Sequence, residues 1–123
     1  MRKNILIVDD DPDVRTSVKN IFEHEGHEVW SVENGVECLE LLEKGFTGIL
    51  LIDLMMPQMD GWATIKEIVK RGLQKNVNVI VITAIGTYRH HKMKGLEPYV
   101  HDYIAKPFDI KELIENIKKI VFV

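Results

Sequence analysis

The amino-acid sequence predicts an α/β fold, a doubly wound parallel sheet of five strands that alternate with helices. The first observation is that short aliphatic runs alternate along the chain with segments whose apolar residues recur at helical spacing. The second is that the runs are almost continuously apolar, as strands are when helices cover both faces of a parallel sheet. Because right-handed crossovers permit few other arrangements, we expect residues 1–123 to form one domain with helices on both sides of the sheet.

The strands are expected at the aliphatic runs, which span residues 5–8, 28–32, 49–52, 77–82 and 103–105. The runs at 28–32 and 103–105 are less purely aliphatic than the other three. Each run is followed by enough chain for one helix, so the order strand, helix repeats to the end of the sequence.

The helices are expected where apolar residues share one face. Val14, Val18, Ile21 and Phe22 are spaced i, i+4, i+7 and i+8, which is the period of an amphipathic helix. Comparable patterns predict helices in the stretches 36–42, 62–69, 87–96 and 110–121.

Residues that favour helix ends lie at the expected boundaries. Pro12 can occupy the first turn of the first helix, and Gly26 can end it. Asp60 and Asp109 can cap the third and the last helix. Asp13 also fits the first turn of a helix, where acids interact favourably with the helix dipole, so we interpret it as structural.

Composition excludes several classes of function. The net charge of −3 provides no general attraction to nucleic acid, so we expect no direct nucleic-acid binding. The apolar run at 5–8 is too short for a signal peptide, and no stretch reaches transmembrane length, so we expect no membrane association and a cytoplasmic location. The single cysteine, Cys38, cannot form an internal disulfide.

Polar side chains follow four of the predicted strands. Asp9 and Asp10 come directly after the first run, Asp53 ends the third, Thr83 ends the fourth and Lys106 follows the fifth. In open α/β sheets, the functional crevice lies outside the carboxyl ends of the strands. We therefore expect three acids, a hydroxyl and an ammonium group to meet at one edge of the sheet.

Three neighbouring carboxylates resist ionisation unless a positive charge lies between them. A metal ion is the simplest source of that charge. A site with only oxygen ligands and room for water favours Mg²⁺ over Zn²⁺, which prefers His or Cys. The predicted cofactor is therefore Mg²⁺.

Four motifs resemble the receiver domain of response regulators: ILIVDD at 5–10, LIDLMMPQMDG at 51–61, VITA at 81–84 and YIAKPF at 103–108. The resemblance spans nearly the whole chain, and the motifs occur in the family's order at the expected strand ends. It implies a flavodoxin-like fold of five βα units with strand order 2-1-3-4-5, and one receiver domain over residues 1–123.

The resemblance also implies a metal-binding role for each acid. Asp53 corresponds to the phosphoacceptor, which takes a phosphoryl group from a sensor histidine kinase or a phosphotransfer protein and also contacts Mg²⁺. Asp10 corresponds to a direct Mg²⁺ ligand, and Asp9 to an acid that holds the metal through water. Met55 corresponds to a position whose backbone carbonyl binds the metal.

Three further residues match the family's switch machinery. Thr83 corresponds to a hydroxyl that moves to bond a phosphoryl oxygen, and Lys106 to an ammonium group that pairs with another. Tyr103 corresponds to an aromatic residue whose rotamer changes with phosphorylation. The bond before Pro107 is often cis in the family, and we expect it to be cis here. The protein would thus be a signalling switch rather than an enzyme in the usual sense, although it would catalyse its own phosphorylation and dephosphorylation.

The resemblance also implies two partner surfaces. Kinase docking is expected around Val14, Arg15, Val18 and Phe108. A downstream partner protein is expected at the helix over 87–96, the last strand and the last helix. The stretch 86–100 departs most from the family, because EPYV at 97–100 replaces the usual small turn and one extra residue separates the third and fourth motifs.

Other interpretations of the acidic motifs stay open at the level of sequence. A receiver-like binding module would have the fold without accepting phosphate. A small phosphatase of the haloacid dehalogenase type would use Asp9, Asp10 and Asp11 as its nucleophile motif, although the chain shows no cap domain. A flavodoxin is disfavoured, because the acidic loop after the first strand would repel the flavin phosphate.

Overall fold

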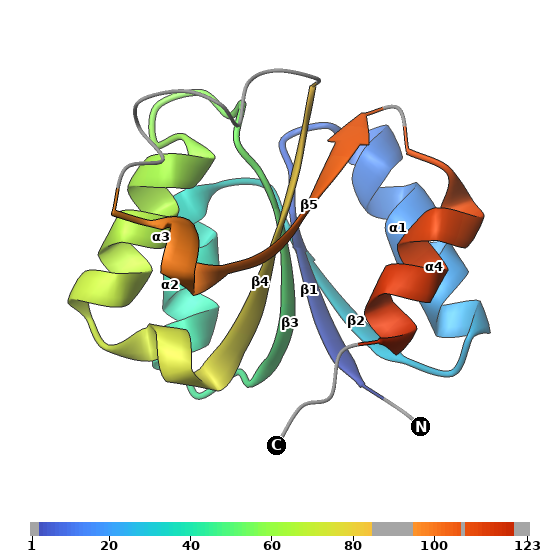
Figure 1. The fold of residues 1–123 in the computed structure, drawn as a ribbon, viewed down its shortest axis with the longest axis horizontal. Coiled ribbons are helices and arrows are strands. Elements are labelled where there is room, and N and C mark those ends of the chain that lie inside the picture. Colours follow the sequence, from blue (N-terminus) through green and yellow to red (C-terminus); the bar gives the residue numbers. More distant parts are fainter. Residues whose placement is uncertain (1–2, 85–94, 107, 120–123) are drawn as a thin grey trace.

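A central parallel sheet lies between two layers of helices (Figure 1). The computed structural model describes residues 3–84, 95–106 and 108–119, without the side chains of residues 83 and 84. The sheet consists of β1 (Asn4–Val8), β2 (Glu28–Val32), β3 (Gly48–Asp53), β4 (Val77–Ala84) and β5 (Val100–Lys106). Its order is β2-β1-β3-β4-β5, and all four strand pairs are parallel, which confirms the predicted fold class and strand order.

Four α-helices are described: α1 (Pro12–His24), α2 (Gly35–Glu43), α3 (Gly61–Lys70) and α4 (Ile110–Lys118). Short 3-10 helices at Leu73–Asn76 and Glu97–Tyr99 precede β4 and β5. The helix expected over 87–96 falls almost entirely outside the described residues, as does the bond before Pro107. Helices α1 and α4 cover one face of the sheet, and α2 and α3 cover the other (Figure 1).

The strands are continuously apolar because successive side chains enter two different cores. In β1, Leu6 and Val8 pack toward α2 and α3, whereas Ile5 and Ile7 pack toward α1 and α4. All four side chains are fully buried. This two-sided burial is the physical reason why an uninterrupted aliphatic run predicts a central parallel strand.

The predicted helix ends are confirmed. Pro12 is in the first turn of α1, and Asp11 caps that helix by accepting a hydrogen bond from the backbone N–H of Asp13. Asp60 caps α3 and Asp109 caps α4 in the same way, each through its side-chain carboxylate. The chain leaves α1 through Gly26, whose φ of +90° lies in the left-handed region that glycine adopts without strain.

Strand β5 is longer than the apolar run predicted, because it begins at Val100. As an edge strand it is partly exposed, and only Ile104 within it is buried, so the polar residues at its start conceal it from a search for aliphatic runs. A register shift pairs Val79 with Val100 but Ile80 with Asp102, which leaves His101 as an extra residue in β5. This bulge accommodates one additional residue between the third and fourth motifs.

One sequence expectation about the surface is wrong. Val18, expected at a kinase-docking surface, is fully buried and packs in the core beneath α1 and α4. It lies on the apolar face of α1, which turns toward the sheet. Any partner of α1 must therefore contact other residues of that helix.

Candidate functional site

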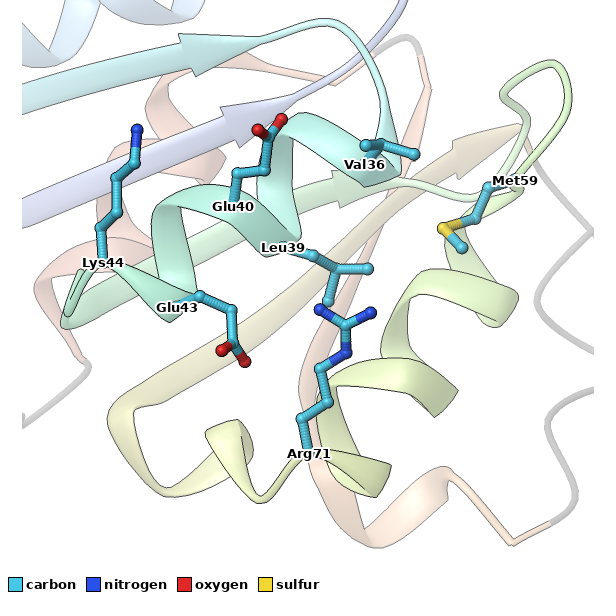
Figure 2. A pocket seen from close by; sticks show the side chains of 7 residues that line it. All are labelled: Val36, Leu39, Glu40, Glu43, Lys44, Met59 and Arg71. Atoms are coloured by element: carbon cyan, nitrogen blue, oxygen red, sulfur yellow. The ribbon is translucent and has the colours of Figure 1, made fainter.

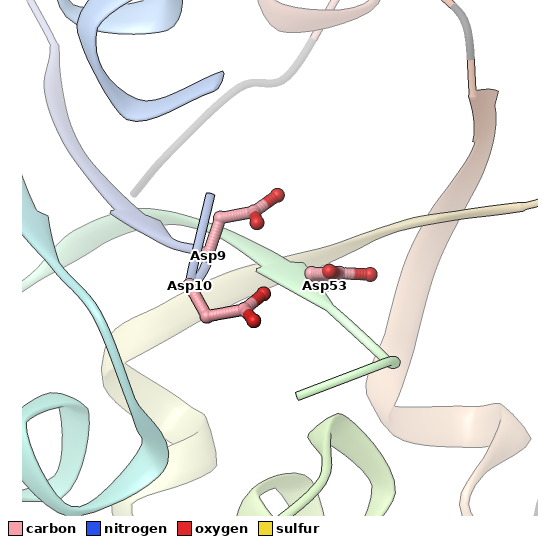
Figure 3. Close-up of side chains that lie close together, drawn as sticks. All are labelled: Asp9, Asp10 and Asp53. Carbon is pink, nitrogen blue, oxygen red and sulfur yellow. The ribbon is translucent and has the colours of Figure 1, made fainter. Parts of the chain in front are cut away.

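The three predicted acids meet at the carboxyl edge of the sheet. Val8 and Ile52 are paired between β1 and β3, so Asp9 and Asp53, which follow them, lie at the same level. The carboxylate groups of Asp9, Asp10 and Asp53 each offer an oxygen within 4.8 Å of the other two. Figure 3 shows the three side chains directed into one space at this edge.

Asp9 is fully buried, and both of its carboxylate oxygens accept hydrogen bonds. The backbone N–H of Asp11 donates to Oδ1 at 2.9 Å, and the ammonium group of Lys106 donates to Oδ2 at 2.8 Å. A buried carboxylate is costly unless it is paired and hydrogen-bonded, and here both conditions are met. The side chain of Asp9 therefore has a defined direction.

Asp53 ends β3 and is 4% exposed. Its Oδ1 accepts from the backbone N–H of Met55 at 3.1 Å, and its Oδ2 lies 3.3 Å from the Lys106 ammonium group. Burial is the main cause that raises the pKa of Asp53 above its ordinary value; the hydrogen bond from Met55 and the charge of Lys106 oppose this, whereas the charge of Asp9 adds to it. The site thus contains a carboxylate whose ionised form is less favourable than in water, even with the charge of Lys106 beside it.

Lys106 connects the two buried acids from the end of β5. Its side chain is 25% exposed, and its ammonium group contacts both Asp9 and Asp53. Burial alone lowers the pKa of Lys106, but the hydrogen bond and charge of Asp9 and the charge of Asp53 outweigh it and raise the pKa above the ordinary value. Lys106 is therefore held in its charged form between two acids that come from distant parts of the chain.

The loop after Asp53 is held against the site by a glycine. Gly61 donates its backbone N–H to the carbonyl of Leu54 at 3.0 Å. A Cβ atom at position 61 would lie 2.5 Å from the backbone oxygen of Asp53 and 2.7 Å from the Cα of Leu54. Only glycine permits this approach, which brings the start of α3 directly beneath the carboxyl edge. Met55, within the same loop, has a side chain that is 62% exposed.

The predicted switch residues Thr83 and Tyr103 belong to β4 and β5. Thr83 belongs to β4 and pairs with Ala105 in β5, but its side chain is outside the described part of the structure. The ring of Tyr103 packs against the core on the side of α2 and α3, and burial, with a smaller effect of Glu97, raises the pKa of its phenol.

One contact to the site was missed by the sequence analysis. The guanidinium group of Arg15, in α1, donates from Nη1 to the backbone oxygen of Asp9 at 2.7 Å. The sequence assigned Arg15 only to a docking surface. A basic residue in the first turn of the helix that follows an acidic strand end is a signal for such a contact, although many such residues simply face solvent.

Two of the hollows on the described surface lie beside helices. One, of about 380 Å³, lies between α2 and α3. Apolar Val36, Leu39 and Met59 line it together with charged Glu40, Glu43, Lys44 and Arg71 (Figure 2). None of the three acids at the carboxyl edge lines it, and within the described residues those acids are the one cluster of three or more potential metal ligands. The other, of about 500 Å³, lies between α1 and the start of α4 and reaches Lys106.

The donor set at the carboxyl edge fits a hard divalent cation. All three side chains supply oxygen, and two are buried while Asp10 is exposed, which leaves a side open for water ligands. This acidic triad could hold a metal ion such as Mg²⁺. No described helix is long and apolar enough to cross a bilayer.

Comparison with known proteins identifies the family. The profile of the response regulator receiver domain matches residues 5–118. A CheY-like receiver domain protein from Methanospirillum hungatei is 45% identical, with a TM-score of 0.87 over 93% of this chain and 90% of that one. The response regulator TrrA of Thermotoga maritima, solved in complex with Mg²⁺ and BeF, is 32% identical, with a TM-score of 0.82 over 97% of this chain and 99% of that one.

Curated relatives are longer than this chain. The transcriptional regulatory protein SrrA of Staphylococcus aureus is 35% identical over 121 residues, which cover 98% of this chain and 48% of SrrA. The chain spans about half the length of the curated relatives it matches. The fold, the acidic edge and these matches together show that the chain belongs to the response regulator receiver domain family, the signalling modules of two-component systems.

Proposed function

We propose that residues 1–123 form one receiver domain that acts as the phosphoacceptor switch of a two-component phosphorelay, with Asp53 as the site of phosphorylation. The observation that carries this proposal is the position of the Asp53 carboxylate. It ends β3 among two further acids, and one of its oxygens lies 3.3 Å from an ammonium group. Asp53 thus lies at a strand end where it faces both further acids and an ammonium group.

Mg²⁺ is the proposed cofactor, held by Asp10, Asp53 and the backbone carbonyl of Met55, with Asp9 acting through water. The all-oxygen donor set supports this assignment, as does the raised pKa of Asp53, which an additional cation would counteract. When bound, the metal would neutralise the incoming phosphoryl oxygens. A relative in this family has been solved with Mg²⁺ and BeF, which is consistent with such a site.

The reaction proposed for the chain is transfer of a phosphoryl group from a phosphohistidine on a sensor histidine kinase or a phosphotransfer protein. A carboxylate oxygen of Asp53 forms a bond to phosphorus while the phosphorus–nitrogen bond breaks, and the electron pair returns to the partner's imidazole. Phosphoryl transfer depends mainly on positioning and charge stabilisation. Met55 N–H orients Oδ1 of Asp53, and Lys106 is near enough to pair with an equatorial phosphoryl oxygen.

The switch would follow from the charge that phosphorylation adds, roughly −1.5 to −2, with three acceptor oxygens. Thr83 would bond one of these oxygens, and Tyr103 would change its rotamer as the adjoining segment rearranges. The output surface would comprise the helix expected over 87–96, β5 and α4, where a downstream protein would bind. The partly exposed edge strand β5 supports this assignment.

The hollow between α1 and α4 is the proposed docking place for the phosphodonor protein. Val14, Ile21, Phe108 and Ile110 line it, and Ile110 is 50% exposed. Lys106 also borders this hollow, so a partner helix seated there would lie beside the phosphoacceptor edge. These contacts replace the buried Val18 in the expected docking surface.

The main competing function is a receiver-like module that binds partners without accepting phosphate. The test is to incubate the chain with Mg²⁺ and acetyl phosphate and to measure its intact mass. We expect a gain of one phosphoryl group that is absent in EDTA and in Asp53→Asn, and retained in Asp13→Asn, which removes an exposed acid outside the cluster. If the folded wild-type chain gains no phosphoryl group under any of these conditions, the binding module is the better account.

A further inference from the structure

We infer that Arg15 is a positioning residue for the acidic cluster: by holding the backbone oxygen of Asp9, it sets the direction of the acids that would bind Mg²⁺. The inference rests on the proposed function of the cluster and deepens it. It concerns a basic side chain on α1 that the phosphoryl chemistry itself does not require.

The contact is short and lies at a point where the backbone needs a donor. Strand β1 ends at Val8, and Asp9, fully buried, begins the turn toward α1. A buried backbone carbonyl is costly without a hydrogen bond. Nη1 of Arg15 donates to this carbonyl at 2.7 Å, which is within the short range of charge-assisted bonds.

Arg15 completes a set of bonds that hold Asp9 at three different atoms. The backbone oxygen accepts from Arg15, Oδ1 accepts from Asp11 N–H, and Oδ2 accepts from Lys106. The backbone N–H of Arg15 also bonds the carbonyl of Asp11 at 3.1 Å. The first turn of α1 is therefore tied to both the main chain and the side chain of Asp9.

The peptide that accepts the Arg15 bond joins Asp9 to Asp10. Because that peptide unit is planar, its orientation directs the start of Asp10 as well as Asp9. Loss of the Arg15 bond leaves a buried carbonyl without this donor, so the turn must rotate toward another one. Both acids of the turn would then leave the direction in which they face Asp53.

The charge of Arg15 and its hydrogen bond predict opposite effects on metal affinity. A guanidinium group close to a cation site repels the cation, so removal of the charge alone would tighten Mg²⁺ binding. Removal of the positioning bond would weaken it. The sign of the change therefore separates the two roles.

The experiment is calorimetric titration of Mg²⁺ into the wild-type chain, Arg15→Gln and Arg15→Lys. Lys19→Gln is the matched control, because Lys19 is an exposed cation one turn further along α1. We expect Arg15→Gln to weaken Mg²⁺ binding by about tenfold or more, as is typical when an outer partner of a metal ligand is lost. Arg15→Lys keeps the charge but lacks the planar guanidinium group that places Nη1 2.7 Å from the Asp9 carbonyl, so it should also weaken binding. Lys19→Gln should leave the affinity unchanged or slightly tighter.

A second readout uses the protein in EDTA. The ¹⁵N chemical shift of the Asp10 amide reports the hydrogen bond to the Asp9 carbonyl in the same peptide group, and it should move upfield in Arg15→Lys but not in Lys19→Gln. This measurement needs only a folded chain and no metal.

The outcomes separate this inference from the proposed function. Equal or tighter Mg²⁺ binding by Arg15→Gln, with an unchanged Asp10 amide in Arg15→Lys, would overturn the positioning role while leaving the metal site in place. Absence of Mg²⁺ binding by the wild-type chain would overturn the proposed metal site itself. If Arg15→Gln does not fold, Arg15→Lys and the Asp10 amide still decide the question.

Discussion

Replacement of Asp53 by asparagine should stabilise the folded chain when no divalent cation is present. The carboxylate is 4% exposed, and burial, followed by the charge of Asp9, raises its pKa, so its ionised form costs folding free energy at pH 7. Asparagine has nearly the same shape, and its side-chain oxygen can still accept the hydrogen bond from Met55. The substitution therefore removes a buried charge without opening a cavity.

The magnitude follows from the distances. Asp9 and Asp53 have oxygens within 4.8 Å of each other, a repulsion of about 3.5 kcal/mol at an effective dielectric constant of about 20. Asp10 is exposed, so solvent screens its repulsion of the Asp53 carboxylate to about 1–2 kcal/mol. The attraction to Lys106 at 3.3 Å is about 5 kcal/mol on the same scale. These contributions nearly cancel, which leaves the desolvation of the carboxylate, so we expect a gain of about 1–2 kcal/mol in the free energy of unfolding.

Mg²⁺ should remove the stability advantage of Asp53→Asn over the wild-type chain. A ligand that binds only the folded state stabilises it by about 2.7 kcal/mol at a hundred times its dissociation constant. The wild-type chain should gain this stabilisation, whereas Asp53→Asn, which lacks a proposed ligand, should gain much less. Near saturating Mg²⁺ the wild type should therefore equal or exceed the variant in stability.

The assay is urea denaturation followed by tryptophan fluorescence, in EDTA and in Mg²⁺. Trp62 is buried at the start of α3, directly after Gly61, and reports both unfolding and the site. Asp13→Asn is the control, and it should lose up to about 1 kcal/mol, since that acid lies in the first turn of α1. A loss of stability of Asp53→Asn in EDTA, or an equal response of both chains to Mg²⁺, would refute this account of the acidic edge.

Three further predictions concern the residues around the site and the sheet. Lys106→Met removes the cation shared by two buried acids and should lower the free energy of unfolding in EDTA by about 2–4 kcal/mol, with part of the loss restored by Mg²⁺; urea titrations in both buffers measure it. Gly61→Ala forces a Cβ to within 2.5 Å of the Asp53 backbone oxygen, so it should cost about 1–3 kcal/mol and slow phosphorylation by acetyl phosphate, followed by intact mass. The pKa of His27 is lowered, chiefly by burial, and its Nδ1 accepts a backbone hydrogen bond, so the unfolded chain binds the proton more tightly. The free energy of unfolding should therefore fall as the pH drops below about 6.5, and it should fall less in His27→Asn. The exposed control His24→Asn should show the same dependence of stability on pH as the wild type.

Much of the fold could be predicted because the signals are local. An aliphatic run such as residues 5–8 is buried on both faces, and helix boundaries depend on caps such as Asp60 that bond their own backbone. Parallel order then places the carboxyl ends of the strands at one edge, so Asp9 and Asp53 could be predicted as neighbours before any coordinates were known. The family resemblance of the motifs that contain Asp9 and Asp53 predicted the same neighbourhood.

The features that the sequence did not reveal depend on contacts between distant or partly exposed residues. The start of β5 was missed because an edge strand needs no continuous apolar face. Val18 was assigned to the docking surface by the family resemblance, although periodicity placed it on the apolar face of the first helix, and the structure buries it there.

The sequence by itself determined the alternation of strands and helices, the helix caps and the set of acids, because each follows from a local pattern or from the topology that such patterns impose. The strand order came from the family resemblance of the motifs. Only the tertiary structure decided how the acids are held. Lys106 reaches Asp9 across 97 positions of sequence, and Arg15 bonds a main-chain oxygen of the same residue. Such bonds depend on where packing brings a side-chain tip to within hydrogen-bond distance, and no periodicity or composition encodes that distance.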